Sequence, residues 1–234
     1  MVELKENEPR PMTEQSAHDL VLGLVKKYLP KAGKIIDVGA GEGAFARSLV
    51  NEGHSVIALD IDDSKLKTPE IELRLCDFNK KFVQNIFSED EKFDAVIAIE
   101  VIEHLENPFD FVRECRKLLT SNGILIVTTP NVEAVNSRLI YLYTGRMLSF
   151  GEYETVPTGH ITPVFAWKAE YLLREAGFKI IWQGYNEKSY YAGVGIKGKI
   201  GSLFVKMLEK IVKGPKGGKT LVVVAKVKDD KASV

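Results

Sequence analysis

The chain has 234 residues, of which 45% are hydrophobic and 27% charged, and its 32 basic side chains balance 32 acidic ones. This length suits a single domain with a proper core, and the zero net charge gives no general attraction to nucleic acid or to an anionic membrane. The polar N-terminus is unlike a signal peptide, and no apolar run is long enough to span a bilayer. Two isolated cysteines, Cys76 and Cys115, cannot form a disulfide framework, so we expect a reduced, cytoplasmic protein.

Short apolar runs alternate with helical patterns along most of the chain, which indicates an α/β fold. The runs are apolar on both faces, as in strands of a parallel sheet that helices cover on each side. Asn122-Gly123 predicts a turn into the fifth strand. Strands are predicted over 34–39, 54–60, 71–77, 93–99, 123–129, 178–185 and 219–227, and helices over 13–29, 42–51, 109–119, 137–143, 162–177 and 201–214.

The boundaries follow from the same pattern. Residues 1–12 are polar and contain proline, which indicates a flexible arm, and residues 229–234 form a solvated tail. Between them, residues 13–228 predict one domain. About 30 residues at 131–162 contain no strand signal, and so long a connection in a compact domain is usually a lid or a substrate-binding element.

A glycine-rich stretch, DVGAGEG (37–43), joins the first strand to the first helix of the alternating part. Gly39 and Gly41 let the backbone approach a ligand, and the helix start points N–H groups at it. With Ala44 the stretch also fits the looser G-x-G-x-x-A dinucleotide pattern, and a glycine turn without a ligand is a further reading.

Acidic residues follow at the ends of the next strands. Asp60 closes the second strand, where a carboxylate can accept both hydroxyls of a ribose. Asp77 and Phe78 close the third, where a carboxylate can meet an adenine amino group and an aromatic ring can stack on the base. Asp37 lies inside the glycine motif; a pyrophosphate would gain nothing from its charge, whereas a ligand with an amino group and a sulfonium would.

These segments together resemble the class I S-adenosylmethionine-dependent methyltransferases over about residues 15–228. The resemblance implies a Rossmann-like, doubly wound, seven-stranded sheet that is mostly parallel, with an antiparallel last strand and helices on both faces. It also implies a set of cofactor-binding residues, namely Asp37, Gly39 and Gly41 around the methionine part, Asp60 with Ile61 at the ribose, and Asp77 with Phe78 at the adenine. The segments that carry it are DVGAGEG, ALDID (58–62), LCDF (75–78), FDAVIAIEVIEHL (93–105) and LLTSNGILIVTTPN (118–131).

The stretch AIEVIEHLENP (98–108) places Glu100, Glu103 and His104 just after the fourth strand. If Val101 to Leu105 form a helical turn, the three side chains share one face and can converge. Three interpretations stay open. The glutamates favour a helix start while the histidine packs beneath a lid, His104 is a general base, or the three are ligands of a divalent metal.

The chain contains four histidines. We expect His18 in the first helix and His54 at the start of the second strand to lie far from the active edge, whereas His160, in PTGHITP, lies where the insertion must return to the sheet. An E-x-x-E-H motif followed by a later histidine resembles two groups, the ubiquinone-biosynthesis O-methyltransferases and the 3′-terminal 2′-O-methyltransferases of small RNAs. In both, the resemblance implies a metal that grips two neighbouring substrate oxygens. The predicted ligands are Glu100, Glu103, His104 and His160, and a mixed imidazole and carboxylate set suits Zn, Mn, Fe or Co, and less securely Mg.

The expected function is S-adenosylmethionine-dependent O-methylation of a small or lipid-like hydroxyl, with Glu103 and His104 as catalytic residues. The alternatives are a metal-independent enzyme with His104 as base, a non-catalytic cofactor-binding regulatory protein and an NAD(P)-dependent oxidoreductase. Nucleic acid is disfavoured because the chain has no excess positive charge. The insertion offers apolar side chains that line a pocket or only cover the sheet, namely Leu139, Ile140, Tyr141, Leu142, Tyr143, Met147, Leu148 and Phe150.

Eight lysines lie between Lys188 and Lys219, around the amphipathic segment 201–214. Such a helix can lie on an anionic membrane surface. We favour the simpler interpretation that the face formed by Leu203, Phe204, Met207, Leu208 and Ile211 packs on the core, with the lysines in water. The sequence does not indicate an oligomeric state.

Overall fold

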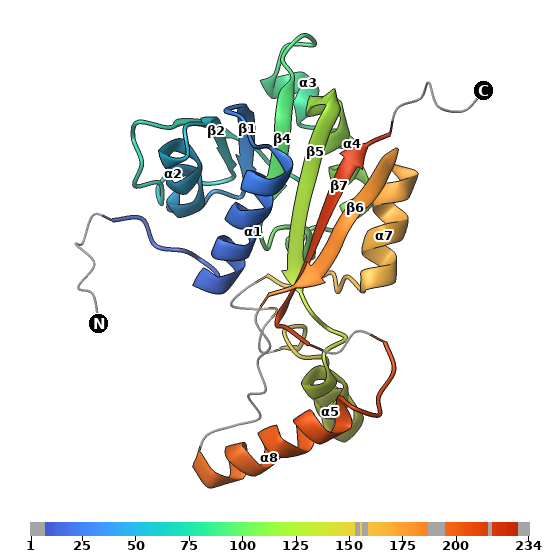
Figure 1. Ribbon diagram of the computed structural model, residues 1–234. Coiled ribbons are helices and arrows are strands. Elements are labelled where there is room, and N and C mark those ends of the chain that lie inside the picture. The colour runs from blue at the N-terminus through green and yellow to red at the C-terminus, as the bar shows by residue number, and fades with distance from the viewer. Residues whose placement is uncertain (1–7, 153–154, 156–158, 187–194, 215–216, 229–234) are drawn as a thin grey trace.

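The computed structural model describes residues 8–152, 155, 159–186, 195–214 and 217–228, with side chains from residue 199 onward in the segment that begins at 195. Its centre is a seven-stranded sheet in the order β3-β2-β1-β4-β5-β7-β6 (Figure 1). β7 is antiparallel to both β5 and β6, and the other strands run parallel to one another. The predicted sheet is therefore confirmed, including its antiparallel last strand.

The strands follow the apolar runs closely. β6 has the predicted bounds, and the others begin or end within a few residues of them. The strands are β1 (Lys34–Val38), β2 (Ser55–Asp60), β3 (Glu72–Leu75), β4 (Phe93–Ala98), β5 (Leu119–Pro130), β6 (Phe178–Tyr185) and β7 (Thr220–Val227).

Helices cover both faces of the sheet, as the apolar character of the strands requires. One face packs against α1 (Gln15–Tyr28) and α2 (Ala44–Asn51), and the other packs against α4 (Pro108–Leu118) and α7 (Ala166–Glu175). Two short elements, α3 (Val83–Ile86) and the 3₁₀ helix η1 (Ile102–His104), lie in the connections around β4.

The helix predicted over 201–214 is α8 (Gly195–Leu208), which begins and ends six residues earlier. Three further boundaries differ from the sequence predictions, and each of these differences has a local cause. Asn122-Gly123 is not a turn into β5; it lies within β5, where the pairing with β4 shifts between Phe93 and Ala95. α2 begins later than expected because Gly43 has a left-handed φ of 86°. α7 begins at Ala166 and not at Thr162. The Thr162 N–H donates to the Glu103 carbonyl and the Thr162 hydroxyl to the Leu105 carbonyl, which holds this residue against the η1 segment.

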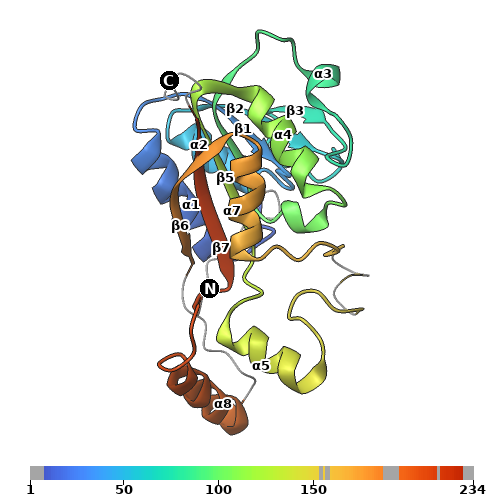
Figure 2. The ribbon, with the colours of Figure 1, turned by 90° about the vertical axis from the view of Figure 1, so that its right-hand side faces the viewer.

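Two helices lie apart from the sheet, beyond the end of β5, where Figures 1 and 2 show them side by side. They are α5 (Val135–Thr144) and α8 (Gly195–Leu208), and they pack against each other. Arg138 of α5 donates a hydrogen bond to the Lys213 carbonyl, 2.8 Å away, which ties α5 to the segment that follows α8. In the described part of the chain, no helix is long and apolar enough to cross a membrane.

Candidate active site

The glycine loop forms a tight backbone crossing after β1. Gly39 and Gly41 have φ values of 71° and 55°, which L side chains rarely adopt. A Cβ atom on Gly39 would lie 2.6 Å from Cγ2 of Val101, so the position also has no room for a side chain. The loop is held to the sheet because the Gly39 N–H donates to the Leu59 carbonyl at 2.8 Å.

Asp60, at the end of β2, organises this loop. Its carboxylate accepts hydrogen bonds from the Gly41 N–H at 2.8 Å, from the Ile61 N–H at 2.8 Å and from the Asp62 N–H at 3.2 Å. These three bonds preorganise the carboxylate at the carboxyl edge of the sheet. Since each carboxylate oxygen has two lone pairs, Asp60 can still accept a bond from a ligand hydroxyl.

Asp37 is in the opposite situation. It is 2% exposed, and its Oδ2 atom has no hydrogen-bond partner among the described residues. Burial, and to a smaller extent the nearby charge of Asp60, raises the pKa of Asp37 to about 7. An unpartnered buried carboxylate oxygen is costly, and a cationic ligand beside it would relieve that cost.

A cavity of about 800 Å³ opens over the loop. Every residue predicted to bind the cofactor lines it, although Ile61 is 68% exposed at its rim. Phe78 lies edge-on to Phe82 and Phe111, which fixes its ring in the cavity wall. The predicted residues on the wall are Asp37, Gly39, Gly41, Asp60, Ile61, Asp77 and Phe78.

The N-terminal segment supplies a wall that the sequence did not predict. Arg10, Met12, Thr13 and His18 all line the cavity, and the Arg10 N–H donates to Glu42 of the glycine loop at 2.7 Å. The expectation that His18 lies far from the active edge was therefore wrong. No local pattern in the sequence marks this contact, because it depends on the path of the chain from the arm into α1.

Glu100 does not join the predicted ligand group. Its φ of 53° turns the backbone before η1 begins, so Glu100 is not part of a regular helical turn with Glu103 and His104. Its carboxylate instead accepts a hydrogen bond from the Thr128 hydroxyl of β5 at 2.9 Å. Burial raises the pKa of Glu100 to about 7, and the Thr128 bond opposes this shift. Glu100 still lines the cavity.

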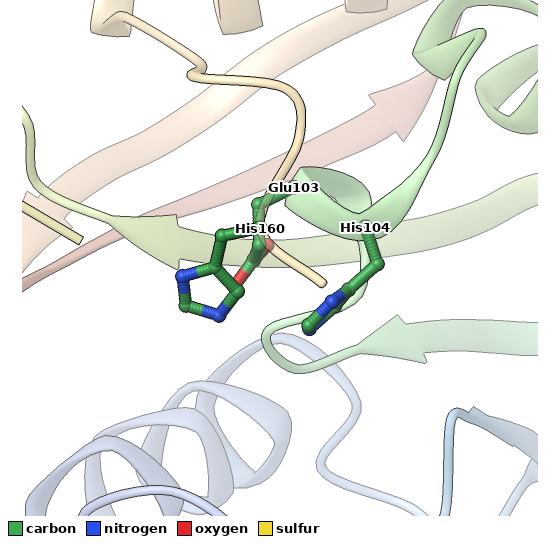
Figure 3. A group of neighbouring side chains, drawn as sticks. All are labelled: Glu103, His104 and His160. Atoms are coloured by element: carbon green, nitrogen blue, oxygen red, sulfur yellow. The ribbon is translucent and has the colours of Figure 1, made fainter. Parts of the chain in front are cut away.

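The other three predicted ligands lie together. One ligand atom from each of Glu103, His104 and His160 lies within 4.8 Å of the others. Figure 3 shows Glu103 and His104 on η1 and His160 on the chain segment that runs beside it. The two imidazole rings meet edge to face with their centroids 4.8 Å apart, and both line the cavity.

Backbone hydrogen bonds hold the His160 segment against η1. The Ile161 and Thr162 N–H groups both donate to the Glu103 carbonyl, at 3.0 and 2.9 Å. Nδ1 of His160 lies 2.9 Å from the Ser149 carbonyl; if Nδ1–H donates this bond, Nε2 keeps its lone pair for a ligand or a proton. Ser149 and Glu100 are the non-glycine residues with positive φ in the described chain, and both adjoin this site.

The cluster has the chemistry of a cation site. Glu103 is 0% exposed, and neither carboxylate oxygen has a hydrogen-bond partner among the described residues. Burial, and then the charge of Glu100, raises the pKa of Glu103 well above its usual range. Two imidazoles and a carboxylate suit a transition-metal ion, and such an ion would satisfy the unpartnered oxygens. The residues therefore fit a divalent cation.

Comparison with known proteins identifies the family. A family described as "Methyltransferase domain" matches residues 10–183. The ubiquinone biosynthesis O-methyltransferase of Rickettsia typhi is 36% identical over 101 residues, covering 42% of this chain and 41% of the relative. That of Glaesserella parasuis is 30% identical over 135 residues, covering 51% of this chain and 56% of the relative. The chain thus spans about half the length of these curated relatives.

Solved structures agree on the fold. An S-adenosylmethionine-dependent methyltransferase from Archaeoglobus fulgidus superposes with a TM-score of 0.63 at 18% identity, covering 89% of this chain and 94% of the other. An identity this low speaks for the fold alone, whereas the family match extends from the arm that lines the cavity to the sixth strand. The chain therefore belongs to the methyltransferase domain family, as a class I S-adenosylmethionine-dependent member.

Proposed function

We propose that the protein transfers the methyl group of S-adenosylmethionine to a hydroxyl oxygen of a small or lipid-like acceptor, and that Glu103, His104 and His160 hold a divalent cation beside it. The observation that carries this proposal is the buried, unpartnered Glu103 carboxylate. It lies just behind two imidazoles, those of His104 and His160, which line the cavity. The relatives from Rickettsia typhi and Glaesserella parasuis are both named as O-methyltransferases, which supports oxygen as the methyl acceptor.

The cavity wall offers a partner for each part of the cofactor. The unpartnered Asp37 oxygen would attract the positively charged methionine part, and Asp60 would accept the ribose hydroxyls. Phe78 would pack on the adenine ring, while the Asp77 carboxylate would accept a hydrogen bond from the adenine amino group. Lys80, then the Asn79 N–H, holds the pKa of Asp77 below its ordinary value, so this carboxylate stays charged.

Methyl transfer requires no covalent intermediate on the protein, because S-adenosylmethionine carries its own leaving group. The acceptor hydroxyl gives up its proton to a nearby base or to solvent, and its oxygen attacks the methyl carbon. The carbon–sulfur bond breaks, and the sulfur leaves with the bonding electrons as S-adenosylhomocysteine. The protein aligns oxygen, methyl and sulfur and excludes water. A bound cation would lower the pKa of the acceptor hydroxyl and hold its oxygen.

The insertion contributes to the acceptor side of this arrangement. The Ser149 carbonyl orients the His160 ring, and the Phe150 ring lies 5.5 Å from that imidazole. We therefore propose that the part of the insertion around His160 lies on the acceptor side of a single catalytic domain. Among the described residues of the insertion only His160 lines the cavity, and Tyr141, Leu142 and Tyr143 of α5 are exposed to solvent.

The same cluster also supports a metal-free variant of the reaction. The edge-to-face contact between His104 and His160 needs no ion, and a ring nitrogen of His104 could take the hydroxyl proton directly. Chelation distinguishes the two mechanisms, since a metal-free enzyme keeps its full rate after treatment with a chelator and dialysis.

The test is a methyl-transfer assay with labelled S-adenosylmethionine and paired acceptors. Alkyl catechols, which offer two neighbouring oxygens, are compared with alkyl phenols of the same chain length. We expect label to appear on the catechols and to be much reduced on the phenols. Transfer only to amines would contradict the proposal. Calorimetric titration that shows binding of NADPH and none of S-adenosylmethionine would favour an oxidoreductase, and cofactor binding without transfer to any acceptor would favour a regulatory protein.

A further inference from the structure

An apolar stripe on α8 and the turn after it faces solvent. The stripe consists of Ile200, Leu203, Phe204, Met207 and Ile211, and all five side chains are exposed, Ile211 by 75%. At 100° per residue they fall within an arc of about 100°. The prediction that this face packs on the core was wrong for every residue it named except Leu208, which is half-buried. α8 packs through its other side, where Val205 is buried, and α5 lies alongside.

The neighbouring helix exposes apolar side chains as well. At the C-terminal end of α5, Leu142 is 83% exposed and Tyr143 is 91% exposed, and Tyr141 is also exposed. Together α5, α8 and the turn after α8 carry nine of the sixteen exposed large apolar side chains of the described chain. Monomeric proteins seldom leave such a concentration of apolar side chains in water without a binding role.

The charges around the stripe have one sign. Lys199, Lys206, Lys210 and Lys213 are exposed and, at 100° per residue, fall along one border of the stripe. Glu209, the single acidic residue between 195 and 214, lies about 180° from its centre. The chain as a whole is neutral, so this positive charge is a local property of the helix.

We propose that α5 and α8 form a docking surface for an anionic lipid bilayer. An amphipathic helix with apolar residues on one face and lysines at its border lies in the headgroup region, where the lysines meet lipid phosphates. Exposed tyrosines suit the same depth, because their rings are apolar and their hydroxyls stay wet. A second copy of this chain is a poorer occupant, since two such surfaces would bring their lysines together.

The helix pair lies at the same edge of the sheet as the cavity, so docking would bring the cavity near the membrane surface. α5 follows the carboxyl end of β5, and the cavity is built from the carboxyl ends of β1, β2 and β4, which run parallel to β5. The docking surface and the cavity therefore belong to the same edge of the sheet. The docking is distinct from the proposed methyl transfer and is measured without cofactor or acceptor, so failure of either leaves the other intact.

The test is co-sedimentation of the full chain with vesicles of phosphatidylcholine alone or mixed with phosphatidylglycerol. We expect binding to the mixed vesicles, weakened by salt, and little binding to phosphatidylcholine alone. The double variant Leu203→Ser/Phe204→Ser should lower the partition coefficient by about tenfold or more, whereas the matched control Leu75→Ser/Trp167→Ser should leave it unchanged. Circular dichroism confirms that each variant is folded.

Charge-reversal variants test whether vesicle binding depends on anionic lipid headgroups or on non-specific hydrophobic adsorption. Lys199→Glu/Lys210→Glu should abolish binding to the mixed vesicles, while Lys31→Glu/Lys179→Glu, which changes the net charge equally, should retain it. The Phe204→Trp variant should show a blue-shifted emission when mixed vesicles are added. Absence of binding at low salt overturns the proposal. So does a homodimer in sedimentation velocity that Leu203→Ser/Phe204→Ser disperses, because the surface would then be a subunit interface.

Discussion

Asp60 and Glu103 are acidic residues near one cavity, yet their surroundings differ. Asp60 accepts three backbone N–H groups and holds the glycine loop in place without a ligand. Glu103 is fully buried, and its two oxygens accept nothing among the described residues. The carboxylate of Asp60 is thus satisfied by the fold itself, whereas that of Glu103, like the buried Oδ2 atom of Asp37, has no partner among the described residues until something positive binds beside it.

This comparison predicts its largest effect at Glu103. Glu103→Gln keeps the shape of the side chain and removes the charge that would hold a cation. We expect turnover to fall by about 10²-fold or more, while S-adenosylmethionine affinity stays within about threefold, because Glu103 is not on the cavity wall. Steady-state rates and calorimetric titration measure the two quantities.

The control for that variant is Glu89→Gln, an exposed glutamate that does not line the cavity. It should match the wild type in both measurements. If Glu103→Gln turns over at the wild-type rate with its true acceptor, Glu103 has no part in the reaction, and its contrast with Asp60 has no functional meaning.

The next effect belongs to Asp60. Asp60→Ala removes the acceptor of three loop amides, so we expect the free energy of unfolding to fall by about 1–3 kcal/mol and cofactor affinity to fall by about tenfold or more. Chemical denaturation and calorimetric titration test this pair of losses. Unchanged stability would show that the amides find water instead.

Replacing Asp37 should stabilise the ligand-free protein, whereas replacing Asp60 should destabilise it. Its folded pKa of about 7 lies above the ordinary value of 3.8, so the folded state holds this proton more tightly, and the residue lowers the stability of the ligand-free protein as pH rises from about 4 to 7. Asp37→Asn should therefore stabilise the ligand-free protein at pH 8 by at most about 4 kcal/mol, with no gain below pH 4, while weakening S-adenosylmethionine binding. Thermal unfolding at several pH values measures this, and a gain of equal size at both extremes would contradict it.

The smallest effect is expected at Ser149. Its φ of 67° is strained for serine, and glycine would adopt it freely. Ser149→Gly should raise the unfolding free energy by about 1 kcal/mol or less and leave turnover nearly unchanged, because the backbone carbonyl still reaches His160. A large loss of turnover would mean that the serine side chain itself orients His160.

Sequence reasoning predicted the sheet well because parallel strands are long apolar runs and their carboxyl ends coincide. Asp37, Asp60 and Asp77 could be placed on one edge for that reason alone, and all three line the cavity. His160 could be singled out because few histidines exist and one ends the insertion. These inferences depend on topology, which local pattern determines strongly.

The failures involve tertiary packing that no local pattern records. The arm and His18 reach the cavity through the path of α1. The turn at Glu100 depends on a hydrogen bond from its N–H to Thr128, which lies 28 residues later on the neighbouring strand β5. The apolar face of α8 has helical spacing whether it meets a core or solvent. The spacing predicted an amphipathic helix correctly and could not say which side α5 would cover.

A cation site at Glu103, His104 and His160 can be measured by titrating Mn²⁺ or Zn²⁺ into chelator-treated protein and into its Glu103→Gln and His160→Ala variants, without cofactor or acceptor. We expect one binding site in the wild type, and affinity lower by about tenfold or more in each variant. Wild-type protein that binds neither ion, or variants that bind as tightly as the wild type, would contradict it.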